Sequence, residues 1–224
     1  MTDYVNKVVT FLREMTKAIT ETGLMLGISL LMAVLLGLPL GVGLYLFSQN
    51  GRYPNRLLAT LGNTYVNIVR SFPFLLLVIA LIPLTRMILG TAFGVYAAAI
   101  PLSIVSIGIY ARLVEQVLLD VPKEVVDLAK SLGVSGVQFV WHFLLVEARS
   151  GLILSLTSVL ISMVSYSTVM GVVGGGGIGD FAIRYGYQRY EYDLMYTTIV
   201  LMIIFVMLVQ WLGTRWAHQL DKRK

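Results

Sequence analysis

Long stretches of this chain contain no ionisable residue, and that feature constrains its fold most strongly. None occurs between Glu21 and Arg52. The apolar core of that stretch, residues 23–47, is long enough as a helix to cross about 30 Å of hydrocarbon. Only 13% of the 224 residues are charged and 57% are hydrophobic, whereas a water-soluble domain has about 25% charged residues. The sequence therefore predicts an all-α integral membrane protein.

Five membrane-spanning helices are expected. The charge-free runs 87–111, 150–179 and 194–214 each hold enough apolar residues for one span. The expected spans are 23–47, 57–83, 93–118, 150–172 and 194–214. The second contains Arg70 and then Pro73, which predicts a kink at that point. A cleaved signal peptide is the alternative interpretation of the first run, but its apolar part is too long and no small-residue cleavage site follows it.

The distribution of lysine and arginine predicts the orientation, because cytoplasmic loops retain positive charge. Five spans place the termini on opposite sides, and the asymmetry favours an outer N-terminus and a cytoplasmic C-terminus. On that assignment the inner segments hold Arg52, Arg56, Lys123, Lys130, Arg149, Arg215, Lys222, Arg223 and Lys224, and the outer loops hold Arg86, Arg184 and Arg189. Lys7, Arg13 and Lys17 in the N-terminal tail act against this count.

The tail itself, residues 1–22, has the pattern of an amphipathic helix lying along the membrane surface, ahead of a transmembrane domain over 23–224. Its apolar residues recur at helical intervals: Val5, Val8, Val9, Leu12, Met15 and Ile19.

The segment 120–147, between the third and fourth spans, predicts two short cytoplasmic helices. Asp120 and Pro122 suit the start of the first helix, and Gly133 suits a left-handed C-cap. Ser135 and Gln138 form a capping-box pattern at the start of the second. Apolar faces on both helices require a cover, which is either the spans or a partner protein.

A family signature occupies the same segment. Residues 127–133, Asp-Leu-Ala-Lys-Ser-Leu-Gly, followed after nine residues by Phe143 to Val146, resemble the EAA loop of bacterial ABC importer permeases, E-A-A-x3-G-x9-I-x-L-P. Ala129, Gly133 and Leu145 keep the pattern, whereas Asp127 replaces the glutamate.

Other segments resemble the methionine-importer permeases in order and spacing, from about residue 24 to the C-terminus. They are residues 66–74, 82–86, Gly90-Thr91, Tyr166-Ser167, Gly171, the run 174–179 and 185–187. The resemblance implies a multi-pass protein of the bacterial inner membrane that imports methionine or a related small amino acid. It further implies a homodimer, two cytoplasmic ATPase subunits docked on the helix pair, and an extracytoplasmic binding protein. Val125, Asp127, Ala129, Leu132 and Gly133 are then the residues expected to couple to the ATPase.

Glycine and hydroxyl clusters give two further candidate sites. Gly174, Gly176 and Gly179 match G-x-G-x-x-G, but they follow a span and not a strand, so dinucleotide binding is disfavoured. They are either a chain break at the outer end of span four or a pliable outer gate. Span four is rich in hydroxyls, and its candidate path residues are Met163, Tyr166, Ser167 and Met170. These side chains either join helices or line the translocation path.

Several chemistries have no support in the residues. There is no cysteine, and His142 and His218 form no metal-binding pattern, so neither a metal site nor a cofactor is expected. No G-x4-G-K-[ST] phosphate loop occurs, so ATP hydrolysis is expected in a partner and this chain is not expected to be an enzyme.

A permease for another small solute remains an alternative. A secondary transporter or channel should show inverted repeats and paired intramembrane acids, which are not evident, and a membrane scaffold would co-purify with no ATPase.

Overall fold

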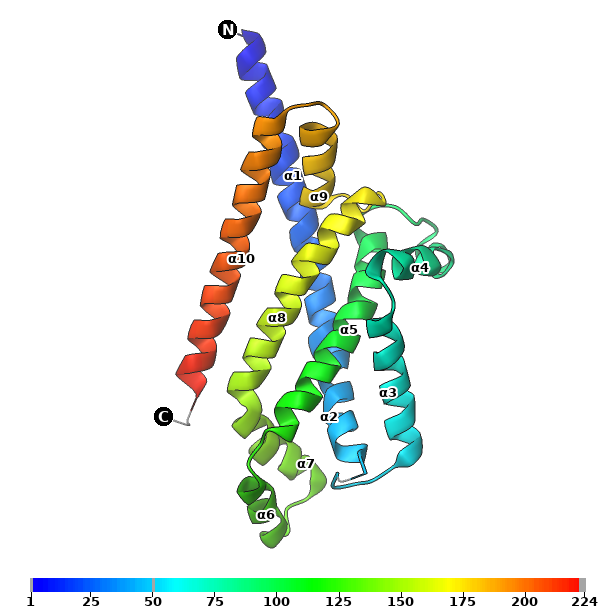
Figure 1. Ribbon diagram of the computed structural model, residues 1–224, viewed down its shortest axis with the longest axis vertical. Helices are drawn as coiled ribbons and strands as arrows, with labels where there is room; N and C mark the ends of the chain where they lie inside the picture. The colour runs from blue at the N-terminus through cyan, green and yellow to red at the C-terminus, as the bar shows by residue number, and fades with distance from the viewer. Residues whose placement is uncertain (1, 50, 222–224) are drawn as a thin grey trace. The chain divides into compact units, whose positions relative to one another are not determined.

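The computed structural model describes residues 2–49 and 51–221, with side chains from residue 11 onward in those ranges. Within this part of the chain the elements are helices joined by turns, and no strand is present (Figure 1). Three of the basic residues used above for the orientation, Lys222, Arg223 and Lys224, lie outside the described residues. The side chains of the tail residues 2–10, which include Val5 and Lys7, lie outside them as well.

Four helical runs are long and apolar enough to cross a membrane: Phe11–Phe47, Val95–Leu119, Gly136–Val172 and Tyr192–Leu220. A fifth span results if the helices α3 (Arg56–Ser71) and α4 (Phe74–Leu89) are counted as one broken span. The prediction of an all-α membrane protein is therefore confirmed, and this pair covers the residues of the expected second span.

The first run joins three elements without a loop: α1 (Thr2–Met32), a π-helical segment η1 (Ala33–Gly37) and α2 (Leu38–Phe47). Helix α1 passes through residue 22 without a break, so the tail and the first span form one continuous helix.

The break between α3 and α4 falls at the predicted proline. Pro73 lacks a backbone N–H and disfavours helical geometry in the residue before it. Helix α3 therefore ends at Ser71, and Pro73 becomes the N-cap of α4. At its other end α4 passes Pro83 and continues to Leu89, where Gly90 at φ +74° stops it and donates to the carbonyl of Arg86 at 2.8 Å. The helix is thus longer than the sequence pattern suggested.

The remaining long helices are α5 (Val95–Leu119), α8 (Leu145–Val172) and α10 (Tyr192–Leu220). Contacts divide the chain into two compact units. One contains Met1–Leu31, Phe72–Ile104 and Leu160–Leu208, and the other contains Met32–Ser71, Val105–Val159 and Val209–Lys224.

The first unit buries a methionine-rich core. Met25, Leu102 and Met163 are fully buried there, and Ala98 and Phe181 are nearly so. Their burial is consistent with side chains that pack between helices and not against lipid.

In the second unit, Leu44, Val66 and Ala111 form a buried cluster that joins α2, α3 and α5. Close approach of α2 to α5 depends on the absence of a side chain at Gly41, where a Cβ would lie 2.5 Å from the carbonyl oxygen of Ala111. Gly37 and Gly41, which are four residues apart in the first span, thus serve packing within the chain. At Gly23 and Gly27 a Cβ would meet no described atom within 4 Å.

Candidate functional site

The expected cytoplasmic helix pair is present as α6 (Lys123–Ser131), followed by the short helix α7 (Gly136–Gln138) and a π-helical segment η2 (Phe139–Leu144). Pro122, and not Asp120, takes the N-cap position, and its carbonyl accepts from the N–H of Val125 at 3.1 Å. The prediction for Asp120 was wrong because this residue lies in the turn directly after α5, where its N–H donates to the carbonyl of Gln116.

The turn between α6 and α7 has the predicted geometry at both ends. Gly133 has φ +65°, its N–H donates to Lys130, and the N–H of Val134 donates to the carbonyl of Ala129. This pair of bonds is the Schellman arrangement, which requires a left-handed residue and therefore favours glycine. Ser135 and Gln138 cap each other's backbone N–H groups, as the sequence predicted. Two local motifs thus fix the angle between the helices.

The apolar residues of the pair divide into a buried set and an exposed set. Ala129 is fully buried within the chain, so its side chain packs under the pair and is not available to a partner protein. This burial argues against a direct contact of the Ala129 side chain with the expected ATPase. Val125 is half-buried and Asp127 is exposed, 3.5 Å from Lys130. The exposed apolar face consists of Leu128, Leu132, Val137 and Trp141.

An arginine that the sequence did not single out holds this turn in place. Arg52, in the loop after α2, donates through Nη2 to the carbonyl of Val134 at 2.6 Å, and its guanidinium lies 4.9 Å from the ring of Phe139. Tyr53 packs against Gly136, where a Cβ would lie 2.6 Å from the phenol oxygen. The first loop and the helix pair therefore form one assembly within their unit.

The four predicted path residues of α8 do not lie around one cavity. Met163, Ser167 and Met170 are buried on one face of the helix, and the Ser167 hydroxyl donates to the carbonyl of Val164 at 2.7 Å. Tyr166 stacks on Phe74 with ring centroids 4.5 Å apart. Their burial gives them packing contacts within the chain.

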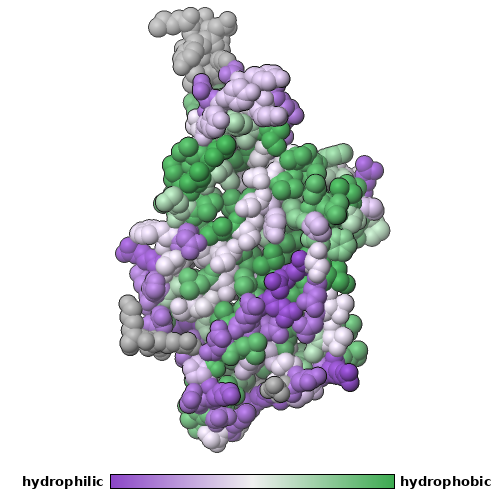
Figure 2. Space-filling model, in the orientation of Figure 1, coloured by the Kyte–Doolittle hydropathy of each residue, from purple (hydrophilic) through white to green (hydrophobic). Residues whose placement is uncertain are grey.

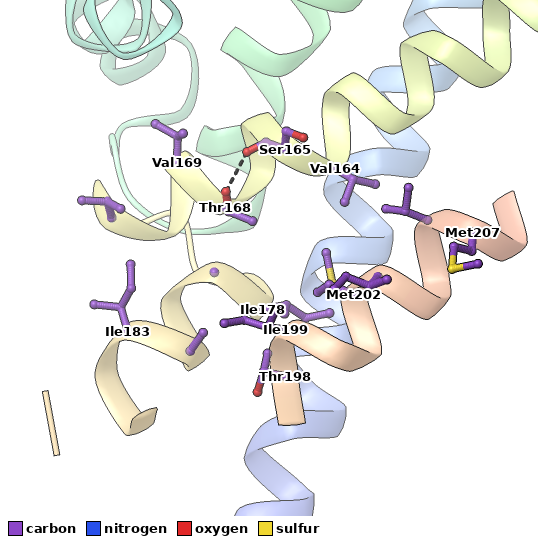
Figure 3. Close-up of a pocket in the computed structure, with 15 residues that line it drawn as sticks. Val164, Ser165, Thr168, Val169, Ile178, Ile183, Thr198, Ile199, Met202 and Met207 are labelled. Carbon is purple, nitrogen blue, oxygen red and sulfur yellow. Dashed lines mark hydrogen bonds between the residues drawn. The ribbon is translucent and has the colours of Figure 1, made fainter. Parts of the chain in front are cut away.

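A different face of α8 borders a hollow of about 610 Å³ beside α9 (Gly177–Phe181), the π-helical segment η3 (Ala182–Tyr187) and α10 (Figure 3). Its lining is apolar, with Val164, Ile178 and Met202 among the residues that face it. The hydroxyl of Thr168 is turned back to the carbonyl of Ser165 at 2.7 Å. This hollow therefore offers shape but little polar recognition.

The glycine run after α8 forms a turn that docks on α1. Gly174 and Gly176 have φ of +86° and +78°, and the carbonyl of Gly174 accepts from the N–H of Gly94 at 3.0 Å. A Cβ at Gly176 would lie 2.6 Å from the carboxylate of Glu21, and a Cβ at Gly179 would lie 2.5 Å from the Cα of Thr168. Positive φ angles at Gly174 and Gly176, and close contacts at Gly176 and Gly179, thus explain why these three positions require glycine.

The same turn is capped by side chains from the other end of the sequence. Glu21 Oε2 accepts from the N–H of Gly177 at 2.8 Å, and the Thr22 hydroxyl accepts from the N–H of Ile178 at 2.9 Å. Further along, Arg184 donates to Asp180, and this hydrogen bond raises the pKa of the Arg184 guanidinium.

A charged network inside the spans was missed. Arg112 of α5 donates to Glu115 Oε2 at 2.6 Å, to Asn67 Oδ1 at 2.9 Å and to Asn63 Oδ1 at 3.1 Å. The sequence signal was available, because Arg112 directly ends a charge-free run and Glu115 follows one helical turn later. Asn63 and Asn67 also share one face of α3 at an interval of four.

Comparison with known proteins agrees with these features. The chain is 43% identical over 188 residues to the "Probable D-methionine transport system permease protein MetI" of Vibrio cholerae, covering 84% of each. It is 36% identical over 180 residues to the "Methionine import system permease protein MetP" of Bacillus subtilis, covering 80% of this chain and 81% of that protein.

Among solved structures, one of inward-facing conformations of "the MetNI methionine ABC transporter" matches with a TM-score of 0.91 and 36% identity, over 94% of this chain and 98% of that one. Another, of "an amino acid ABC transporter with histidines", has a TM-score of 0.68 at 17% identity and supports the fold alone. Residues 33–224 match the family described as "Binding-protein-dependent transport system inner membrane component". The chain therefore belongs to the inner-membrane components of binding-protein-dependent transport systems.

Proposed function

We propose that this chain is the membrane-spanning permease subunit of an ATP-binding-cassette importer for methionine or a related small amino acid. The structural observation that carries the proposal is the helix pair α6–α7, whose exposed apolar face is presented by two fixed caps and the Arg52 contact. Relatives over more than four-fifths of this chain are described as methionine permeases, which supports the substrate class.

ATP chemistry belongs to a partner in this account. The sequence has no phosphate loop, so we place ATP hydrolysis in a cytoplasmic ATPase. Two copies of that ATPase would bind two copies of this chain at their helix pairs. Leu128, Leu132 and Trp141 supply apolar contact there, and Asp127 and Lys130 form a polar rim. Because the turn at Gly133 fixes the angle between α6 and α7, movement of the ATPase would be transmitted to α5 and α8, which directly flank the pair.

The orientation in this account has the N-terminus outside, the helix pair in the cytoplasm and the glycine turn at the outer surface. There, an extracytoplasmic binding protein would deliver the substrate. Gly174, Gly176 and Gly179 would act as an outer gate element. The polar contacts described between their turn and α1 are the hydrogen bonds that Glu21 and Thr22 accept from the N–H groups of Gly177 and Ile178. Met163, Tyr166, Ser167 and Met170 would reach the path when their helix faces separate.

Co-purification tests this function. The chain, expressed from its native locus with an affinity tag, should recover one ATPase and, after cross-linking, one secreted binding protein. Recovery of both, with methionine released from the binding protein on denaturation, supports the proposal. A binding protein that releases a different solute would change the substrate class. An intact chain that recovers no ATPase would contradict the permease function itself.

A further inference from the structure

Helix α3 has a polar face although it forms part of a membrane span. Arg56, Thr60, Asn63, Thr64 and Asn67 recur at three- and four-residue intervals, so they lie along one side of the helix. The adjacent exposed side is apolar, with Leu57, Leu61 and Ile68. Polar groups within a bilayer face other polar groups or a water-filled space and not lipid.

The polar face lines a cavity of about 690 Å³ together with the loop that follows α2. Figure 2 shows hydrophilic residues interrupting the hydrophobic surface where α3 and α5 lie. The lining residues are Phe47, Ser48, Gln49, Pro54, Asn55, Arg56, Ala59, Thr60, Asn63, Thr64 and Asn67. Because the same loop carries Arg52, which holds the coupling turn, the cavity lies in the unit that contains the helix pair.

The network behind the cavity determines which atoms face it. The amide oxygen of Asn67 accepts from Arg112, and the amide is planar, so its NH₂ group points away from the arginine. Asn63 is committed at both ends, since its oxygen accepts from Arg112 and its NH₂ donates to the carbonyl of Ala59 at 2.8 Å. Within the described residues, Asn67 is therefore the asparagine of this network whose NH₂ group makes no hydrogen bond.

The cavity presents donors and positive charge. Within the described residues, neither the hydroxyls of Thr60 and Thr64 nor the NH₂ of Asn67 has a hydrogen-bond partner, and Arg56 has no ion pair. Glu115 balances the charge of Arg112, and its side chain is only 12% exposed, so no carboxylate lines the cavity. Guanidinium, amide and hydroxyl donors together bind anionic oxygens, and the carboxylate of an amino acid supplies such oxygens.

We infer that this cavity is a station on the translocation path that receives the carboxylate of the amino acid, with Asn67 as its central contact. The inference rests on the proposed function. On the proposed orientation, the loop after α2 is cytoplasmic, so the station lies toward the inner end of the path. Arg112 and Glu115 are positioning residues, because they hold the Asn67 amide with its donors toward the cavity.

Replacement of Asn67 by aspartate tests this polarity with little disturbance of the network. A carboxylate oxygen still accepts from Arg112, but the two donors that face the cavity become a charged acceptor that repels a carboxylate. Uptake of radiolabelled methionine would be measured in proteoliposomes with the wild-type ATPase and saturating binding protein. We expect Asn67→Asp to lower the uptake rate at least about tenfold, which corresponds to about 1.4 kcal/mol, with wild-type recovery of the complex.

Gln210→Glu is the matched control, since it also converts an exposed amide in a membrane helix to a carboxylate, but on α10 and away from the cavity. It should keep wild-type uptake. A wild-type rate in Asn67→Asp overturns the inference while leaving the proposed function intact. Absence of amino-acid uptake by the wild-type complex would instead contradict the proposed function.

A second variant covers the case in which Asn67→Asp does not assemble. Thr60→Val with Thr64→Val removes two hydroxyl donors at almost constant volume, and neither hydroxyl supports the described structure. We expect this double variant to assemble normally and to slow uptake about threefold or more. Wild-type uptake in the double variant would overturn the inference.

Discussion

The carboxylate of Glu21 accepts a hydrogen bond from the backbone N–H of Gly177 at 2.8 Å, across 156 residues of sequence. Gly177 has φ +84° and opens the short helix α9, where backbone N–H groups have no partner inside the helix. Glu21 therefore ties the glycine turn to α1, and Thr22 makes the adjacent bond to Ile178.

Removal of the Glu21 carboxylate should loosen that turn. Glu21→Leu leaves the Gly177 N–H without an acceptor, and a lost hydrogen bond to a charged group is worth about 1.5–3 kcal/mol. We expect a Tm several degrees lower for the purified complex, measured in detergent. Glu21→Gln keeps an amide acceptor and should lose less. Lys17→Ala removes only an exposed 3.9 Å ion pair and should have no effect; equal Tm values for all three variants would contradict the contact's role.

Substitution of Gly133 should impair coupling. A β-branched residue at φ +65° costs on the order of 1–2 kcal/mol in backbone strain and misdirects the turn between α6 and α7. We expect Gly133→Val to retain ATP hydrolysis by the complex and to lose most methionine uptake. Gly133→Asn tolerates the left-handed region and should keep both activities. Normal uptake by the valine variant would show that the angle of this turn does not couple ATP hydrolysis to methionine uptake.

Ala129 and Leu132 should respond differently to glutamate, because one is buried and the other exposed. Ala129→Glu places an unpaired charge inside the chain, which is strongly unfavourable, so we expect a low yield of folded permease. Leu132→Glu changes a side chain that is 62% exposed, so the permease should fold normally but recover little ATPase. Size-exclusion profiles and pull-down yields measure the two effects. Full ATPase recovery with Leu132→Glu would remove that residue from the interface.

The orientation can be tested by labelling, because the chain has no native cysteine. Val137, on the helix pair, is 70% exposed, and Gln188, after η3, is also exposed. A cysteine at Gln188 should react with a membrane-impermeant maleimide in intact cells. A cysteine at Val137 should react only after permeabilisation. The reverse pattern would invert the proposed topology.

The features that the sequence predicted correctly are local. Apolar runs, the proline break, the Gly133 turn and the Ser135 capping box depend on residues within a few positions of one another. Each is confirmed in the structure, apart from the N-cap at Asp120, where Pro122 took the position.

Features that depend on distant contacts were not predicted. Ala129 was expected to couple to the ATPase, and its burial was not foreseen because helical periodicity does not show which side of an amphipathic helix a neighbouring segment covers. The Arg112 network joins α3 and α5, and the Glu21 contact joins α1 to α9, which follows the fourth span, so neither could be read as a local pattern. The path residues of α8 were selected for their hydroxyl and thioether groups, yet Ser167 satisfies its hydroxyl within its own helix.

The most direct test of the account is ATP-driven transport by the reconstituted assembly. Proteoliposomes would contain this chain and its co-purified ATPase, with the binding protein and radiolabelled methionine on the side opposite the ATPase. The account predicts methionine accumulation that requires both hydrolysable ATP and the binding protein. Equal methionine accumulation with a non-hydrolysable ATP analogue, or with the binding protein omitted, would contradict it.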